Sequence, residues 1–156
     1  MKYFVILFII LTYCITHARA DEANCLALNI YHEARNQPLA GKLAVAQVTL
    51  NRVKDDRFPN SICGVVMQGF YFNHNPIINK CQFSWWCDGK SDKPKDIKAW
   101  EQAQILAYQL LNNMFVQIDL VKGATHYHAI YVKPYWINKK KKVTVIADHV
   151  FYKWEK

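Results

Sequence analysis

Residues 24–54 read NCLALNIYHEARNQPLAGKLAVAQVTLNRVK, and this stretch decides which fold the chain can adopt. Residues 24–35 begin with an asparagine that suits a helix start and contain no Gly or Pro, so they predict a helix. A loop over residues 36–41 leads into a second predicted helix over residues 39–54. Apolar side chains recur there three or four positions apart, which indicates one buried face. They are Leu43, Ala46, Leu50 and Val53.

Beyond residue 54 the sequence predicts one further long helix. Residues 61–67 fit a short helical turn. Residues 68–94 fit an irregular loop, because Gly, Pro, Asn, Asp and aromatic residues follow no period there. Residues 95–115 repeat apolar residues at helical spacing and predict the third main helix. Its expected buried face consists of Ile97, Trp100, Gln104, Ala107, Leu111 and Met114.

The last part of the chain has the alternation of β-strands. Residues 124–132 alternate in polarity, and residues 143–148 and 150–152 form a second β segment. The lysines at 139–142 are expected to form a solvated turn. We therefore expect an α+β fold, in which three main helices and a small C-terminal antiparallel sheet form one compact domain.

The first twenty residues have the three parts of a secretory signal peptide. Lys2 gives a charged start, residues 3–15 are almost wholly apolar, and Ala18-Arg19-Ala20 fits a cleavage site. The apolar run is shorter than the ~20 residues that span a bilayer, and an uncleaved membrane anchor is the alternative. We expect a leader over residues 1–20 and a secreted or periplasmic monomer over residues 21–156, without stable membrane insertion.

Charge and cysteine content agree with an exported protein. The chain has a formal net charge of +8, which suits an anionic partner such as a bacterial envelope, and no nucleic acid partner is expected outside the cytoplasm. One cysteine, Cys14, lies in the leader, and the other four predict two disulfides with three possible pairings. A zinc site is the alternative, although C-x-x-C pairs are missing. The four are Cys25, Cys63, Cys81 and Cys87.

Glu33 is the residue best suited to acid chemistry. It continues the apolar stripe of Leu26 and Ile30 on the first helix, so lost solvation should raise the pKa of its carboxyl group. A carboxylic acid that is still protonated near neutral pH can donate its proton to a leaving glycosidic oxygen. The alternative is a structural glutamate in a salt bridge with Arg35 or Arg52.

Four sequence blocks, taken in order, resemble the SleB-type cell wall hydrolases, the family of spore-cortex-lytic enzymes. The blocks are IYHEARNQPLAGKLAVAQVTLNRV, RFPNSICGVV, CQFSWWCDG and THYHAIYVKPYW, and the resemblance covers about residues 25–152. The family usually has Gly-Glu where this chain has Asn36-Gln37, so no second acid is expected at that position. The resemblance implies that residues 21–156 form a cell wall hydrolase catalytic domain with a lysozyme-like arrangement.

The resemblance also implies an activity, which is cleavage of peptidoglycan between N-acetylmuramic acid and N-acetylglucosamine without a cofactor. The glutamate of the Tyr-x-Glu-Ala-Arg block, here Glu33, is the family's catalytic acid. A lytic transglycosylase needs only this group, which protonates the bridging oxygen and then accepts a proton from the muramyl 6-hydroxyl as a 1,6-anhydro ring closes. Hydrolysis usually needs a second carboxylate about 5–10 Å away. Asp88 is the candidate for that role, unless it is a turn residue.

Substrate-binding side chains are expected in the irregular loop and in the strand at residues 124–132. Amides can bind N-acetyl groups and aromatic faces can stack on pyranose rings, although the loop aromatics could equally cover the core. Alternation places Thr125 and Tyr127 on one strand face, as partners of Glu33 or of the substrate. The full set is Tyr31, Gln82, Phe83, Ser84, Trp85, Thr125 and Tyr127.

The histidines leave a zinc site open, although we expect no metal. His126 and His128 share the other strand face and could bind zinc together with His149 or His32. No H-E-x-x-H motif is present, because the residue four after His32 is Asn36. Two alternative functions therefore stay open, a zinc-dependent peptidoglycan amidase and a non-catalytic glycan-binding module.

Overall fold

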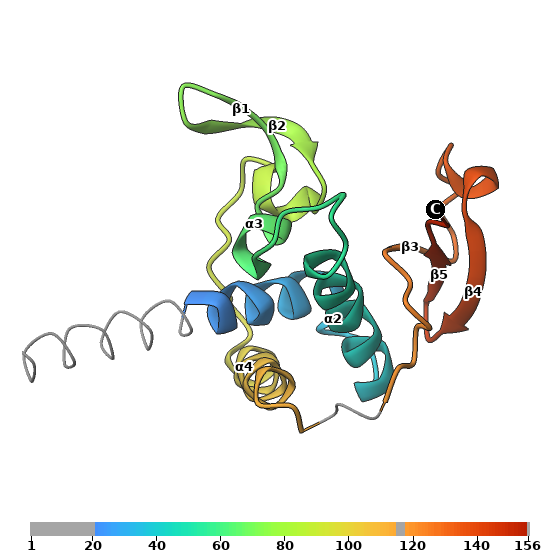
Figure 1. Cartoon of the computed structure of the whole chain (residues 1–156). Helices are drawn as coiled ribbons and strands as arrows, with labels where there is room; N and C mark the ends of the chain where they lie inside the picture. Colours follow the sequence, from blue (N-terminus) through green and yellow to red (C-terminus); the bar gives the residue numbers. More distant parts are fainter. Residues whose placement is uncertain (1–20, 115–117, 156) are drawn as a thin grey trace, which may run out of the picture.

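A computed structural model describes residues 21–114 and 118–155, so the leader expected over residues 1–20 lies outside the described residues. A helix over residues 21–34 comes first in this part of the chain (Figure 1). The elements that follow are α2 (Leu39–Val53), α3 (Ile62–Val66), β1 (Gly69–Phe72), β2 (Asn75–Cys81), η1 (Ser84–Cys87), α4 (Ile97–Leu111), β3 (His126–Ala129), η2 (Ile137–Lys139), β4 (Lys141–Ile146) and β5 (His149–Lys153).

Helix α2 is the centre of the fold because it is buried on two sides. Its Leu43 and Ala46 pack in a larger apolar cluster with the helix over residues 21–34, α3, η1 and α4. Its Ala44 and Val48 pack instead against Phe151 of β5, in a smaller cluster. The predicted buried face is confirmed, and the small Ala44 on the opposite face explains how the sheet comes close to the helix.

Polar side chains of α2 fix the chain segment that leads into the sheet. Asn51 Nδ2 donates to the carbonyl of Ala124 at 2.9 Å, and Arg52 Nε donates to the carbonyl of Thr125 at 2.7 Å. One turn earlier, the amide of Gln47 accepts from the backbone N–H of Leu120 at 3.0 Å. Backbone groups in a buried connection need such partners, so α2 sets the position at which β3 begins.

The C-terminal sheet is antiparallel, as the sequence predicted, and its strand order is β3-β5-β4. Tyr127 pairs with Phe151 and Ala129 pairs with His149. The lysine run is not wholly a turn, because Lys141 and Lys142 belong to β4. Their side chains are exposed, so an edge strand can carry them without burying charge.

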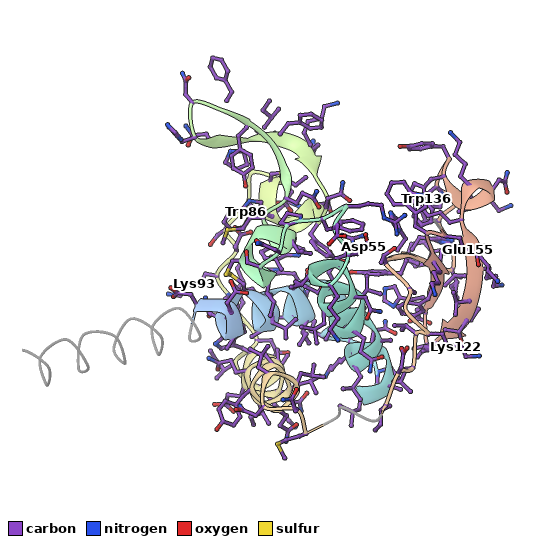
Figure 2. All side chains as sticks on the ribbon, viewed as in Figure 1. Asp55, Trp86, Lys93, Lys122, Trp136 and Glu155 are labelled. Atoms are coloured by element: carbon purple, nitrogen blue, oxygen red, sulfur yellow. A yellow bond between two sulfur atoms is a disulfide. The ribbon has the colours of Figure 1, made fainter. Side chains whose placement is uncertain are left out.

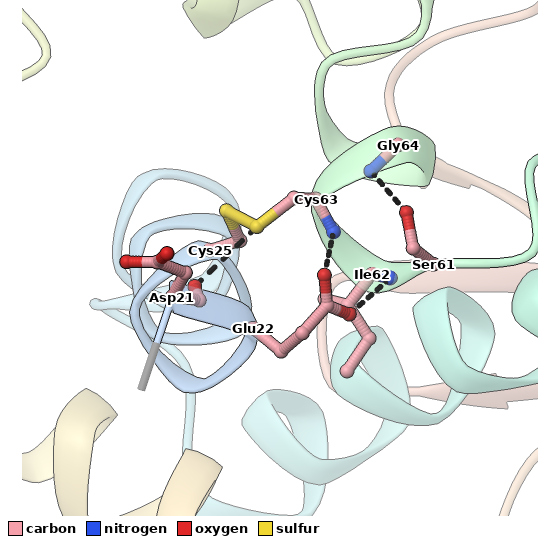
Figure 3. Close-up of a disulfide and its surroundings, with 7 residues drawn as sticks. All are labelled: Asp21, Glu22, Cys25, Ser61, Ile62, Cys63 and Gly64. Carbon is pink, nitrogen blue, oxygen red and sulfur yellow. Dashed lines mark hydrogen bonds between the residues drawn. A yellow bond between two sulfur atoms is a disulfide. The ribbon is translucent and has the colours of Figure 1, made fainter. Parts of the chain in front are cut away.

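A disulfide and a carboxylate join the N-terminal helix to α3 (Figure 3). Cys25 is bonded to Cys63 across a separation of 38 residues. The carboxylate of Glu22 accepts from the backbone N–H groups of Ile62 and Cys63, at 2.6 and 3.4 Å. Closing a loop of this length stabilises the fold by about 4 kcal/mol in the chain-entropy account. The second disulfide, Cys81–Cys87, closes a short loop around η1, so the prediction of two disulfides is confirmed.

The expectation of an irregular loop over residues 68–94 is wrong in its first half. Residues 69–81 form the hairpin β1–β2, turned by Asn73 and His74 in left-handed conformations. Asn is among the residues that tolerate this backbone. Most side chains of the hairpin are exposed on both faces, and the sequence therefore lacks the alternation that identifies a half-buried strand.

Helix α4 forms where the third helix was predicted, and its buried face agrees with the prediction only in part. Ala107 is buried and Trp100 and Leu111 pack against the core as expected, whereas Gln104 is exposed. The buried residues of α4 are Ala103, Leu106, Ala107 and Leu110. Ile97 and Met114 were expected inside, yet each is 63 % exposed. The small Ala103 permits close packing of α4 on the core. Ile97 is the first residue of the helix and Met114 follows its end, so both lie outside the core.

Candidate active site

The carboxyl group of Glu33 lies at the end of the N-terminal helix, beside a pocket. The pocket has a volume of about 220 Å³, and its lining includes Asp148 and His149 from the β4–β5 turn. A Cβ at Gly41 would lie 2.9 Å from the Cβ of Gln37 and 3.4 Å from the Cβ of Ala147. Glycine in the first turn of α2 therefore lets the Gln37 loop fold closely onto the helix, with the β4–β5 turn in contact beside it.

Burial raises the pKa of Glu33, as its apolar neighbours predicted. The hydroxyl of Tyr127 donates a hydrogen bond to Glu33 Oε2 at 2.9 Å, which opposes the rise because it favours the carboxylate. The positive charge of Arg52 opposes it as well. Glu33 makes no salt bridge with any residue of the described part of the chain, so the structural alternative is not what the geometry shows.

Arg52 is a buried cation held between two aromatic rings. Its Cζ lies 5.2 Å from the ring centroids of both Phe58 and Phe83. Only 5 % of the residue is exposed, and its Nη1 atom has no hydrogen-bond partner among the residues that the structure describes. Burying a cation without a carboxylate partner is costly. Arg52 makes no salt bridge with Glu33, and its charge adds positive potential at the Glu33 site.

The structure brings Tyr127 of the predicted pair to Glu33 and places Thr125 elsewhere. The hydroxyl of Thr125 shares a 3.0 Å hydrogen bond with the neighbouring His126. Thr125 is buried, and its carbonyl holds Arg52. Its connection to the acid therefore runs through a positively charged side chain, and its hydroxyl bonds to His126 rather than to Glu33.

The four loop residues divide into two buried and two exposed side chains. Phe83 and Trp85 are 3 % and 8 % exposed. Trp85 donates from Nε1 to the side chain of Asn29 at 3.2 Å and stacks on His32, with ring centroids 4.4 Å apart. Gln82 and Ser84 are exposed. Phe83 and Trp85 thus pack against Arg52 and His32 next to the site, while Gln82 and Ser84 are open to solvent.

Tyr31 supports the start of α4. It is 4 % exposed, and its hydroxyl accepts hydrogen bonds from the backbone N–H groups of Lys95 and Asp96, both at 3.0 Å. Its ring meets Trp100 edge-on. These contacts occupy the hydroxyl that was expected to bind substrate.

The four histidines of the possible zinc site lie in separate surroundings. Both His126 and His128 contact Trp136, so they share a strand face as predicted. His32 stacks on Trp85, and His149 lies edge-on to Tyr127. Within residues 21–114 and 118–155, no group of three or more His, Cys, Asp or Glu side chains is arranged to hold a metal ion.

Two aspartates differ in their relation to the site. Asp88 accepts from the backbone N–H of Lys90 at 2.8 Å, as a turn residue does. Asp148 lines the same pocket as Glu33, and its carboxylate accepts from Gln37 Nε2 at 3.1 Å. Sequence reasoning missed Asp148 and named His149 only as a possible zinc ligand, because both follow a turn at Ala147 whose left-handed backbone carries no glycine.

The fold and the site together define a small α+β domain with one desolvated acid at a pocket. Residues 36–152 match the family described as Cell Wall Hydrolase, so the chain belongs to that family and the predicted resemblance is confirmed. The match begins just after Glu33. The assignment of the acid therefore rests on geometry and on the Tyr31-x-Glu33-Ala34-Arg35 block.

Relatives and a solved structure agree with the family. The spore cortex-lytic enzyme of Halalkalibacterium halodurans is 28% identical over 84% of this chain and 34% of its own length. That of Bacillus subtilis is 40% identical over 33% of this chain and 17% of its own. The catalytic domain of the germination-specific lytic transglycosylase SleB from Bacillus anthracis has a TM-score of 0.59 at 26% identity, covering 85% of this chain and 93% of that one.

The matches also set limits on what carries over. The chain spans 34% and 17% of the length of these two curated relatives, but nearly the whole of the solved catalytic domain. The predicted fold class, a compact α+β domain, is confirmed by that domain. None of the helices in the described residues is both long and apolar enough to cross a membrane.

Proposed function

We propose that this chain cleaves peptidoglycan glycan strands between N-acetylmuramic acid and N-acetylglucosamine as a lytic transglycosylase, with Glu33 as its single acid/base. One observation carries the proposal, namely a carboxyl group whose pKa is raised by burial and whose position is held by the Tyr127 hydroxyl. A protonated acid of this kind is what a glycosidic leaving group requires.

In the proposed reaction one proton is given and one is taken back. Protonated Glu33 donates to the bridging oxygen as the C1–O bond of the muramyl residue breaks and an oxocarbenium-like centre forms. The resulting carboxylate accepts a proton from the muramyl 6-hydroxyl, whose oxygen bonds to C1 and closes the 1,6-anhydro ring. Tyr127 and Arg52 favour the carboxylate formed in the first half. Atoms balance without water.

Hydrolysis is a second candidate, favoured by one observation. Asp148 is a carboxylate in the same pocket as Glu33 and could activate a water molecule. Two carboxyl groups on one pocket are the arrangement of glycosidases that release a reducing sugar. The products separate the two reactions, because water leaves a free reducing end where the intramolecular attack leaves an anhydro ring.

We also propose that the chain acts outside the cytoplasm, on the wall itself. The apolar run and Ala18-Arg19-Ala20 fit an export signal. Two disulfides support it, since such bonds persist in oxidising compartments. Peptidoglycan, the proposed substrate, also lies outside the cytoplasm.

Mass spectrometry of digested peptidoglycan tests the proposal directly. The wild-type protein is expected to release anhydro-muropeptides, and Glu33→Gln is expected to lower the release by about 10²–10⁴-fold, the usual contribution of a positioned acid. Glu101→Gln is the matched control, because Glu101 is an exposed glutamate of α4. Reducing muramyl ends would show that the reaction is hydrolysis and not transglycosylation. Free stem peptides would indicate an amidase, and binding without products a glycan-binding module.

A further inference from the structure

A cluster of cations and indole rings lies where α2 meets the end of the sheet. Lys140 Nζ lies 3.8 Å from the ring centroid of Trp154, and Arg57 Cζ lies 4.5 Å from the same centroid. Lys140 also lies 5.9 Å from the ring of Trp136. Figure 2 labels Trp136, Asp55 and Glu155 in this part of the molecule. We call Arg57, Lys140, Trp136 and Trp154 the indole–cation cluster.

Lys140 is the incomplete member of the cluster. The nearby acids have other partners, since Asp55 pairs with Arg57 at 2.5 Å and Glu155 pairs with Lys141 at 2.9 Å. Lys140 itself makes no salt bridge and donates no hydrogen bond to any residue in the described ranges 21–114 and 118–155. An ammonium group has three donors and ordinarily finds acceptors for them, so this one is oriented by ring faces alone.

The surroundings of Lys140 are positive. Burial, and after it the charges of Arg57, Arg52 and Lys139, lower the pKa of Lys140. Burial and the charges of Arg52, Lys140 and Arg57 lower the pKa of His126 to about 3, so its imidazole is neutral at physiological pH. Mutual repulsion of this kind is relieved when an anion binds between the cations.

The cluster and the Glu33 pocket lie at the two ends of one strand. His149, the first residue of β5, lines the Glu33 pocket. Trp154 directly follows the last residue of the same strand. At ~3.3 Å per residue the two are roughly 16 Å apart, a distance that an extended polymer of sugars can span. The cluster is also accessible, because Trp154 is 41 % exposed.

We propose that the indole–cation cluster binds a carboxylate of the peptide stems that muramyl residues carry, and so selects strands with free acidic stems. The inference rests on the proposed function for its substrate. The glycan backbone of uncut strands is neutral, so the stems are the acidic part of that polymer. Trp136 and Trp154 hold the ammonium group of Lys140 in place, and Lys140 offers its donors for the acid.

Equilibrium binding tests the cluster without depending on catalysis. All proteins carry Glu33→Gln, so that no strand is cut, and the probes are soluble peptide-bearing glycan strands with native stems or with stem carboxylates converted to amides. The protein is expected to bind native strands about tenfold more tightly than amidated ones, the effect of a charge-assisted hydrogen bond. Adding Lys140→Gln is expected to remove most of that preference, and adding Lys142→Gln, which changes an exposed lysine of β4, to leave it intact.

Two outcomes overturn the proposal. Equal affinity for native and amidated strands would show that no stem carboxylate is recognised. Equal losses in the Lys140 and Lys142 variants would show only a general attraction between a basic protein and an acidic polymer. This experiment measures binding, so its result does not depend on the product analysis. If the proposed cleavage site were wrong, the binding test would still be valid.

Discussion

The two ends of strand β5 handle charge in opposite ways. At the His149 end, the carboxyl group of Glu33 is buried and receives a hydrogen bond from Tyr127, so its environment is complete within the protein. At the Trp154 end, Lys140 stacks on indole rings with no acceptor among the described residues. The carboxyl group of Glu33 is held ready to exchange a proton, whereas the ammonium group of Lys140 has no acceptor among the described residues.

This difference separates two kinds of experiment. A change at the Glu33 end alters properties of the free protein, such as its stability and the pH at which the acid ionises. A change at the Trp154 end is expected to matter mainly when an acidic ligand is present. The strand between them is shared, so damage to its core should affect both ends together.

Phe151→Ala is expected to have the largest effect, because it removes the residue that joins both ends to α2. Phe151 is fully buried, packs in the smaller core cluster and contacts Tyr127 with ring centroids 5.7 Å apart. Truncating such a ring costs about 3–5 kcal/mol of unfolding free energy, which denaturant titration measures. Val145→Ala on β4, where the side chain is 49 % exposed, is the control and should cost less than about 1 kcal/mol. Similar losses in both would contradict a core role for Phe151.

Tyr127→Phe is expected to change only the properties of the Glu33 site, at one end of strand β5. The hydroxyl favours the carboxylate of Glu33, so its removal should raise the pKa of Glu33 further. The basic limb of the kcat/KM profile should then move to higher pH, while kcat falls about tenfold as the acid loses its orientation.

The control for Tyr127→Phe is Tyr108→Phe, since Tyr108 is a 65 % exposed tyrosine of α4. Its pH profile should match that of the wild type. A basic limb that stays in place or moves to lower pH in Tyr127→Phe would show that the hydroxyl does not act on the ionisation of Glu33.

The sequence predicted the Glu33 end far better than the Trp154 end, for a physical reason. Glu33 belongs to a helix whose apolar spacing alone predicts desolvation, and Tyr127 lies on the strand face that alternation assigns to it. Both signals are local. The indole–cation cluster instead joins Arg57, Lys140 and Trp154 from three separate segments, and no periodicity reveals such a meeting.

The same distinction applies to the elements. Helix α2 was predicted almost to the residue because its two buried sides supply a strong apolar pattern. The hairpin β1–β2 was missed because its exposed faces supply none, and the buried stripe of α4 was predicted only in part because a small residue, Ala103, decided the packing. A periodic sequence pattern indicates which side chains are buried. Elements that bury few side chains, or that pack through alanine, are therefore not predicted correctly from such a pattern.

Glu33→Gln is expected to have the smallest effect on stability among these variants, and the effect should be a gain rather than a loss. The pKa of Glu33 in the folded protein is raised above its ordinary value, so the folded state holds this proton more tightly than the unfolded chain does. That contribution to folding is fully present below the ordinary pKa and is lost as the pH rises through the raised one. At neutral pH and above, the wild-type protein therefore carries a cost that the uncharged amide avoids.

Thermal unfolding across pH measures this cost. The glutamine can still accept from Tyr127, so Glu33→Gln should raise Tm by about 2–4 °C at pH 8, with the gain shrinking toward zero at pH 4. Lys142→Gln, which changes an exposed lysine of β4, gives the comparison, because the pH dependence of its Tm should follow the wild type. A Glu33→Gln protein less stable than wild type at pH 8 would mean that the charged carboxylate is stabilised in the fold, and the proposed acid would lose its physical basis.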